Sequence, residues 1–138
     1  GLVCSLAASE KEDEIERLIM YYPALCVPDD ARRGCLIGTQ IDPDNVPDSF
    51  HGVFVKLGKK YVEDARTLDP YEQICTFKKP VLIIHGIEDK LVKIEYSRKA
   101  NERYDDCELI EVHGDHGFIL KGFKAGKKAT EKYLSDLD

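Results

Sequence analysis

A carboxylate and an imidazole follow two predicted strands, each at the point where its strand ends. Asp89 lies in the loop after the apolar run 81–84, and His116 lies in the loop after the run 107–112. Because ligands bind beyond the carboxyl ends of the strands in an open parallel sheet, both side chains are expected on one rim. A carboxylate there can hold the imidazole in one tautomer and stabilise the imidazolium. The two residues therefore predict the acid and base of a nucleophile–His–acid triad.

A buried parallel sheet is the element that must position this pair. The segment 80–86 reads Pro-Val-Leu-Ile-Ile-His-Gly, and its four consecutive apolar residues are typical of a strand buried on both faces. Strands that alternate with helices indicate a right-handed parallel α/β sheet. The remaining predicted elements are helices at 2–9, 59–68, 71–77, 94–104 and 118–137 (the last beginning after Gly122), and strands at 15–22 and 107–112.

The segment 23–57 interrupts this alternation. It contains four of the six prolines of the chain, together with several glycines, and the sequence predicts irregular structure over its length. A loop of that length in a compact domain is usually a lid or a binding insertion.

Composition limits the classes of protein that the chain can represent. Its 138 residues fit one domain, and 43% apolar with 33% charged residues excludes a disordered or fibrous chain. The net charge of −6 argues against sequence-independent nucleic-acid binding, and no apolar run reaches the roughly 18 residues of a membrane span. The five cysteines are odd in number and form no CxxC motif. They are typical of reduced thiols, and with no signal peptide recognisable at the start we expect a cytoplasmic protein.

The two loops resemble a known family. Pro80-Val-Leu-Ile-Ile-His-Gly-Ile-Glu-Asp-Lys-Leu-Val92 and Gly114-Asp-His-Gly-Phe118 resemble the acid and histidine segments of α/β-hydrolases, in which the triad order is Ser, Asp or Glu, then His. The resemblance implies that Asp89 is the triad acid and His116 the triad base. Glu88 and His113 are interpreted as neighbours of these two residues, and His85 as a support for the turn. A metal site at His113, Asp115 and His116 is the weaker alternative, because no ligand set with zinc or iron spacing accompanies them.

The first residues extend the resemblance. Gly1-Leu-Val-Cys-Ser-Leu-Ala-Ala resembles the last glycine of a G-x-S-x-G nucleophile elbow and the helix that follows it. The nucleophilic serine is therefore expected upstream of Gly1, since no serine of this chain lies in such a motif. The implied fold is α/β: residues 1–138 form the C-terminal portion of one three-layer α/β-hydrolase domain with a parallel sheet.

The layout of the insertion resembles that of small microbial cinnamoyl or feruloyl esterases. A lid inserted at about 24–76 would cover the phenolic end of the substrate in such an enzyme. The resemblance implies substrate-binding roles for Asp30, Gln40 and Tyr61. A carboxylate or amide can accept a hydrogen bond from a phenol, and a tyrosine supplies an apolar ring with a polar tip. The alternative for Asp30 is a helix cap, and for Tyr61 it is packing in the lid core.

Two classes of function remain open at this point. One is a serine carboxylic-ester hydrolase with no metal or organic cofactor, acting on a small-molecule ester; a lipase, thioesterase or prolyl-type peptidase would show the same segments. The other is a catalytically silent fragment or half-assembly. The strand at 15–22 would then present an apolar edge, and we expect it to self-associate or to require the N-terminal half of the fold.

Overall fold

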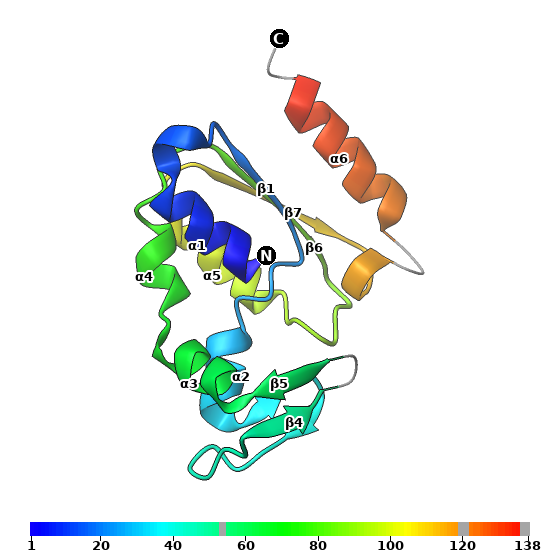
Figure 1. Ribbon diagram of the computed structural model, residues 1–138. Coiled ribbons are helices and arrows are strands. Elements are labelled where there is room, and N and C mark those ends of the chain that lie inside the picture. Colours follow the sequence, from blue (N-terminus) through cyan, green and yellow to red (C-terminus); the bar gives the residue numbers. More distant parts are fainter. Residues whose placement is uncertain (53–54, 119–121, 136–138) are drawn as a thin grey trace. The chain divides into compact units, whose positions relative to one another are not determined.

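The chain forms two compact units, shown as ribbons in Figure 1. The computed structural model describes residues 1–52, 55–118 and 122–135. Unit 1 comprises Gly1–Leu25 and Pro70–Asp138, and unit 2 comprises Cys26–Asp69. Of the helices within the described ranges, none combines the length and apolar character needed to cross a membrane.

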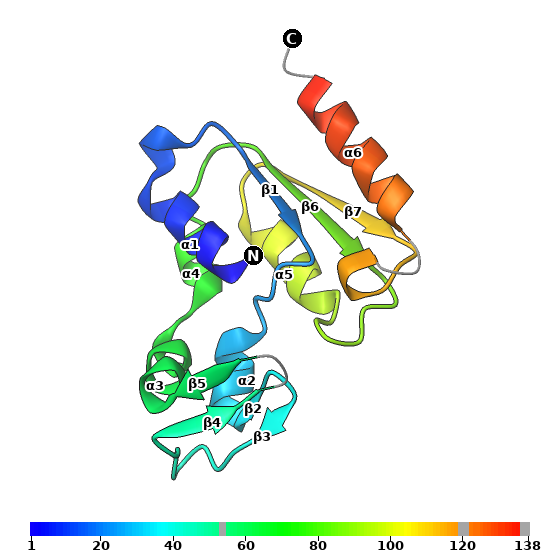
Figure 2. The same ribbon diagram turned by 45° about the vertical axis from the view of Figure 1, so that its right-hand side comes forward.

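Unit 1 contains a three-stranded parallel sheet in the order β1-β6-β7 (Figure 2). Its strands are β1 (Leu18–Tyr21), β6 (Val81–Gly86) and β7 (Cys107–Val112). All six residues of the central strand β6 are buried, as the run of apolar residues predicts. The helices are α1 (Leu2–Glu10), α4 (Pro70–Ile74), α5 (Glu95–Arg103) and α6 (Phe123–Ser135), with 3₁₀ turns η1 (Glu12–Glu14) and η2 (His116–Phe118).

Helices cover both faces of this sheet, so the predicted layered α/β architecture is confirmed (Figures 1 and 2). On one face the side chains of Val81 and Ile83 pack with residues of α1, α4 and α5. On the other face Leu82 and Ile84 pack with Ala129 and Tyr133 of α6. This alternation follows from the two-residue period of a strand.

The predicted elements of unit 1 match the observed ones, with shifts at their ends. The strand expected at 15–22 is shorter, because η1 and a bend occupy the residues before Leu18. The helix expected at 118–137 is α6, which begins at Phe123 as the position of Gly122 suggests. Residues 119–121 and 136–137 of that prediction lie outside the described residues.

Unit 2 is more regular than the sequence predicts. It contains α2 (Val27–Arg33), α3 (Lys59–Thr67) and two hairpins, β2 (Cys35–Leu36) with β3 (Thr39–Gln40) and β4 (Ser49–His51) with β5 (Lys56–Gly58). The expectation of irregular structure over 23–57 is therefore wrong. Strands of two or three residues are too short to show a period, and the signals of the seven-residue helix α2 are its ends: Pro28 with two acids in the first turn, and two arginines followed by Gly34 at the last. A small core including Leu36, Phe50 and Val62 holds the unit together.

Candidate active site

Two loops meet at the carboxyl edge of the sheet in unit 1. The loop after β6 and the loop after β7 are joined by backbone hydrogen bonds from Ile87 N to Val112 O (2.9 Å) and from Glu88 N to Gly114 O (3.0 Å). Gly86 permits this approach, because a Cβ atom there would lie 2.2 Å from the carbonyl oxygen of Gly114. The absence of a side chain at Gly86 thus allows the histidine loop to cross directly over the end of β6.

Asp89 is fixed by hydrogen bonds to both carboxylate oxygens. Its Oδ1 accepts from the backbone N–H groups of Leu91 and Val92, each at 2.9 Å. Its Oδ2 lies 2.8 Å from Nδ1 of His116, and the Asp89 side chain is fully buried. A carboxylate is acceptor-only when ionised, so Nδ1 of His116 carries the proton in this pair. The free lone pair of the imidazole is therefore at Nε2.

His116 presents this second nitrogen to the open side of the loop. Its side chain is 30% exposed, and within the described part of the chain Nε2 has no hydrogen-bond partner. Gly117, in a left-handed conformation with φ 83°, turns the backbone immediately after it. An imidazole with a buried carboxylate on Nδ1 and an accessible Nε2 can take up and return a proton.

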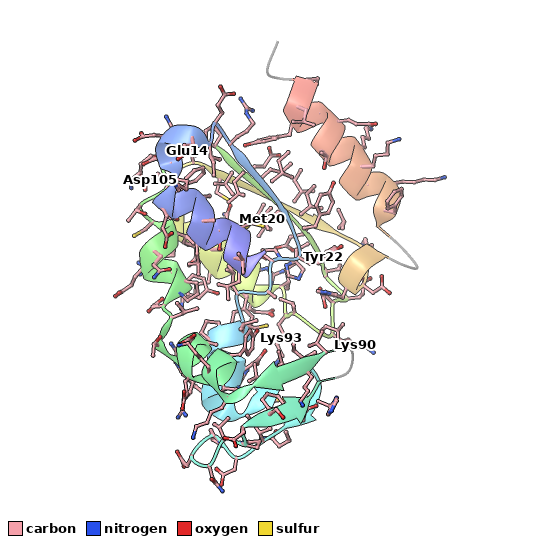
Figure 3. The ribbon with its side chains drawn as sticks, viewed as in Figure 1. Glu14, Met20, Tyr22, Lys90, Lys93 and Asp105 are labelled. Atoms are coloured by element: carbon pink, nitrogen blue, oxygen red, sulfur yellow. The ribbon has the colours of Figure 1, made fainter. Side chains whose placement is uncertain are left out.

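The ring of Tyr22 packs against this imidazole, with 4.6 Å between the ring centroids. Figure 3 labels Tyr22 at the end of β1, beside the η2 turn that carries His116. Tyr22 has a positive φ of 36°, which non-glycine residues rarely adopt and which is often found at functional sites. Tyr22 was not predicted as a site residue; its position between a strand end and Pro23 was the available signal in the sequence.

The N-terminus of α1 lies against the same segment. A Cβ atom on Gly1 would lie 2.5 Å from Cα of Pro23, so the two backbones are in close contact. Figures 1 and 2 both place the N-terminus beside the carboxyl end of β1. The start of α1 therefore lies next to the segment of Tyr22, and the ring of Tyr22 packs on His116.

Glu88 and His113 form a second carboxylate–imidazole pair beside the first. Glu88 Oε1 lies 3.0 Å from His113 Nδ1, and Gly114 N donates to Glu88 Oε2 at 2.6 Å. The His113 side chain, followed by the Gly114 backbone, holds the pKa of the Glu88 carboxyl below its usual range. This pair is open to water, with side chains 49% and 82% exposed, so its charge interaction is weak. The two loops are joined chiefly by their backbone hydrogen bonds.

His85 is a fully buried residue of β6, and burial lowers the pKa of its imidazole. This residue was expected to support the turn. Its ring nitrogens contact Ser97 of α5 and the carbonyl of Val92, both within the region that holds Asp89. Ser97 was missed, because a serine in the middle of a predicted helix gives no sequence signal of such a contact.

The three residues expected to bind substrate all lie in unit 2. Asp30 forms an ion pair with Arg33 at 2.5 Å and hydrogen-bonds the Cys26 thiol; burial, followed by that Asp30 bond, raises the pKa of Cys26 to about 12. Tyr61 is also near Cys26, and burial followed by that neighbour raises the pKa of its phenol. Gln40 instead donates weakly to the carbonyls of Arg33 and Ile41, at 3.3 and 3.4 Å. Unit 2 therefore brings Asp30 and Tyr61 to one cysteine and places Gln40 at the end of α2.

Within the described ranges, no group of three or more histidine, cysteine, aspartate or glutamate side chains is arranged to hold a metal ion. The two histidine–carboxylate pairs at the sheet edge are separate pairs, with different partners and different exposure.

Comparison with known proteins identifies the architecture. No family model matches the chain, and none of the curated proteins matches its sequence. Among solved structures, Est1E from Butyrivibrio proteoclasticus is 32% identical with a TM-score of 0.88, over 99% of this chain and 57% of that one. The same protein with ferulic acid bound gives a TM-score of 0.89 at 32% identity, over 99% of this chain and 55% of that one.

More distant structures share the fold alone. The monoacylglycerol lipase of Paleococcus ferrophilus is 19% identical with a TM-score of 0.65, over 97% of this chain and 64% of that one. The parallel sheet, the order of its elements and these matches agree with the resemblance found in the two loops. The chain is therefore a partial α/β-hydrolase, which spans somewhat more than half the length of the Est1E structures that it matches.

Proposed function

We propose that this chain supplies the acid and the base of a serine carboxylic-ester hydrolase. The observation that carries the proposal is the contact between Asp89 Oδ2 and His116 Nδ1, at 2.8 Å, with the acid buried and the base accessible at Nε2. The nucleophilic serine belongs to a polypeptide segment that precedes Gly1. The similarity to Est1E supports this, since this chain spans only 57% of that protein.

In the proposed reaction the serine hydroxyl attacks the ester carbonyl carbon. His116 Nε2 takes the hydroxyl proton as the serine oxygen forms its bond to carbon, and then gives that proton to the departing alcohol. Asp89 holds the ring in the Nδ1–H tautomer and stabilises the imidazolium while it exists. Water then repeats the sequence on the acyl-enzyme, and His116 returns its proton to the serine. The chain's own residues require no metal or organic cofactor for these steps.

We propose that the substrate is a cinnamoyl- or feruloyl-type ester. The support is the identity of 32% to Est1E, which is known with ferulic acid bound. In this proposal Asp30, Gln40 and Tyr61 of the lid recognise the phenolic end. Asp30 would accept from the phenol hydroxyl in competition with Arg33, which now occupies its carboxylate. A lipase, thioesterase or prolyl-type peptidase uses the same acid and base, so the lid residues carry the choice of substrate.

The test of the chemistry uses the protein at its full natural length. Intact mass is measured before and after treatment with a fluorophosphonate probe, alongside hydrolysis of methyl ferulate. One adduct on a species heavier than 15.6 kDa, together with a loss of about 10⁴-fold or more in kcat for His116→Ala, is expected. His113→Ala is the matched control and should hydrolyse ester as the unaltered protein does. A natural protein of only 15.6 kDa that takes no adduct would instead identify a silent fragment or half-assembly.

A second measurement tests the substrate class. Methyl cinnamate lacks the phenol hydroxyl of methyl ferulate, so a lid that hydrogen-bonds this hydroxyl should discriminate between the two esters. Asp30→Asn and Tyr61→Phe should each reduce the ratio of kcat/KM for methyl ferulate over methyl cinnamate. Asp29→Asn, which alters the neighbouring carboxylate paired with Arg32, is the control. An unchanged ratio in both lid variants would contradict the assignment of the lid residues while leaving the triad untouched.

A further inference from the structure

A buried histidine on the central strand has no step in the proposed reaction. His85 is the fifth residue of β6, and its side chain is completely buried. It points to the face of the sheet that α5 covers, since it shares the alternation of Val81 and Ile83. A buried imidazole is costly unless both ring nitrogens find partners, so its partners show what it is placed to do.

The partners define its tautomer. Nε2 lies 3.0 Å from the carbonyl oxygen of Val92 and 3.3 Å from Oδ2 of Asp89, and both of these atoms accept hydrogen bonds. Nε2 must therefore carry the proton. Nδ1 is then an acceptor, and the hydroxyl of Ser97, 2.6 Å away on α5, donates to it. The result is a continuous series of donors from Ser97 through His85 to Asp89.

Asp89 thus has two imidazoles on one oxygen. Oδ2 receives Nδ1–H of His116 at 2.8 Å and the longer contact from Nε2–H of His85 at 3.3 Å. With the two backbone bonds on Oδ1, the carboxylate is held from four directions. His85 contacts Asp89 Oδ2, which is also the oxygen that accepts from His116. A change at His85 therefore alters both the position and the basicity of Oδ2.

Burial keeps His85 neutral, because it is the main cause of the lowered pKa of this imidazole. The hydrogen bond to the Val92 carbonyl and the charge of Asp89 oppose burial, and the charge of His116 acts in the same direction as burial. Glu111 of the neighbouring strand β7 is paired with His85 in the strand register. Its carboxylate is bound by Arg98 of α5 at 2.7 Å, so its charge is balanced by the guanidinium. The protonated imidazole that the reaction needs is therefore His116, with His85 as a neutral donor.

We propose that His85 is a positioning residue for the triad acid, and that Ser97 fixes the tautomer in which it acts. Its Nε2–H group holds Asp89 Oδ2 in line with His116 and simultaneously holds the loop carbonyl of Val92. This inference rests on the proposed esterase function, because the acid it positions is the acid of that reaction. His85 itself touches no reacting atom.

A pair of substitutions at one position separates positioning from packing. His85→Gln keeps an N–H donor near the position of Nε2. His85→Leu fills the buried space with an apolar side chain and removes the donor. In the full-length protein we expect His85→Leu to lower kcat by up to about 100-fold, the cost of a misplaced catalytic group, with KM little changed. His85→Gln should recover about tenfold or more of this loss, as one hydrogen bond to a charged group allows.

The pKa of His116 gives a readout that a purely structural role would not move. Loss of the second donor leaves more of the Asp89 charge to His116, so the midpoint of the His116 titration should move to higher pH in His85→Leu. Both imidazole NMR titration and the acidic limb of kcat/KM report it. Ser97→Ala should shift the same quantities in the same direction by less, and Ser9→Ala, a helical serine that bonds only the Ser5 carbonyl, should shift neither.

Each outcome decides the proposal. A folded His85→Leu protein with unaltered kcat and an unaltered His116 pKa would overturn it. If His85→Leu does not fold, Ser97→Ala carries the decision by the same two measurements, because it leaves the imidazole in place. Failure of the proposed function can be told apart from failure of this inference. If the unaltered protein has no esterase activity, the proposed function is wrong, and the NMR titration of His116 in the His85 variants still tests the positioning role.

Discussion

At the scale of the residue, the two adjacent acids Glu88 and Asp89 have different environments and different partners. Asp89 is buried and hydrogen-bonds the partly buried His116, whereas Glu88 is half exposed and hydrogen-bonds the solvated His113. The sequence predicted which acid and which histidine belong together, because the family pattern specifies their spacing. It could not predict the partners of His85, since those come from α5 and from a loop carbonyl.

Asp89→Asn and Glu88→Gln form a matched pair that tests this difference. In Asp89→Asn the side-chain amide can donate to Nδ1 of His116, which moves the imidazole proton to Nε2 and removes the base. We expect kcat in the full-length protein to fall by about 10⁴-fold, with little change in fold, because the amide oxygen can still accept from Leu91 and Val92. Glu88→Gln should keep its kcat. Equal losses in the two variants would show that the acids had been assigned wrongly.

His85 also predicts how stability depends on pH. Its pKa in the folded protein lies below its usual value of 6.5, chiefly because it is buried. Below about pH 6.5 the unfolded chain therefore binds a proton that the folded chain does not, so the free energy of unfolding falls as the pH falls. Carboxyls with lowered pKa values, such as those of Glu88 and Glu111, lose their contribution only below about pH 4.5.

Urea unfolding of the full-length protein between about pH 3.5 and 7 measures this contribution. His85→Gln should flatten the decline of unfolding free energy between pH 6.5 and 5, and leave the decline below pH 4.5 as it was. A variant that retains the full decline between pH 6.5 and 5 would show that the folded protein already binds the proton at His85.

At the scale of the element, the loop after β7 crosses closely over the end of β6, and this crossing sets the position of His116 relative to Asp89. Gly86→Ala would place a Cβ atom 2.2 Å from Gly114 O and 2.7 Å from Gly114 C, both backbone atoms. The loop that carries His116 must then move. We expect a loss of about 1–3 kcal/mol in unfolding free energy, together with a fall in kcat. Urea unfolding and methyl ferulate hydrolysis by the full-length protein measure the two effects.

Gly58→Ala is the control for this change. Gly58 precedes α3 in unit 2, has a negative φ, and its added Cβ would meet nothing closer than Asp48 O at 3.8 Å. Its cost should be at most about 1 kcal/mol, from the weaker helix cap that alanine provides. If Gly86→Ala costs no more than Gly58→Ala and keeps its activity, the crossing is looser than the structure indicates.

The elements also show where sequence patterns are informative. Val81–Gly86 was predicted to within a residue, because its run of apolar residues shows its burial. Cys107–Val112 was also predicted at its observed bounds, although only Val112 is buried. In unit 2 the helix expected at 59–68 is confirmed as α3 (Lys59–Thr67). The hairpins were not predicted, since their strands have two or three residues and the core of the unit depends on contacts between distant positions such as Leu36 and Val62. Local periodicity cannot encode such contacts.

At the scale of the whole molecule, β1 lies at one end of the described sheet and pairs with β6 on one side. The N–H groups of Leu18 and Tyr22 donate to carbonyls of the β6 side, so by alternation those of Ile19 and Tyr21 point away from it. An apolar strand with outward backbone donors is a template for another strand. In the proposed assembly the N-terminal part of the fold occupies this edge.

The 138-residue chain on its own should therefore self-associate through β1. Sedimentation velocity at several concentrations is expected to show species heavier than 15.6 kDa. Ile19→Pro removes an outward N–H without touching the bonds to β6, so it should shift the population toward monomer. Lys56→Pro, at the start of the separate strand β5, controls for a general effect of proline. If the unaltered chain is a stable monomer at all concentrations, the prediction that this edge needs a partner is wrong.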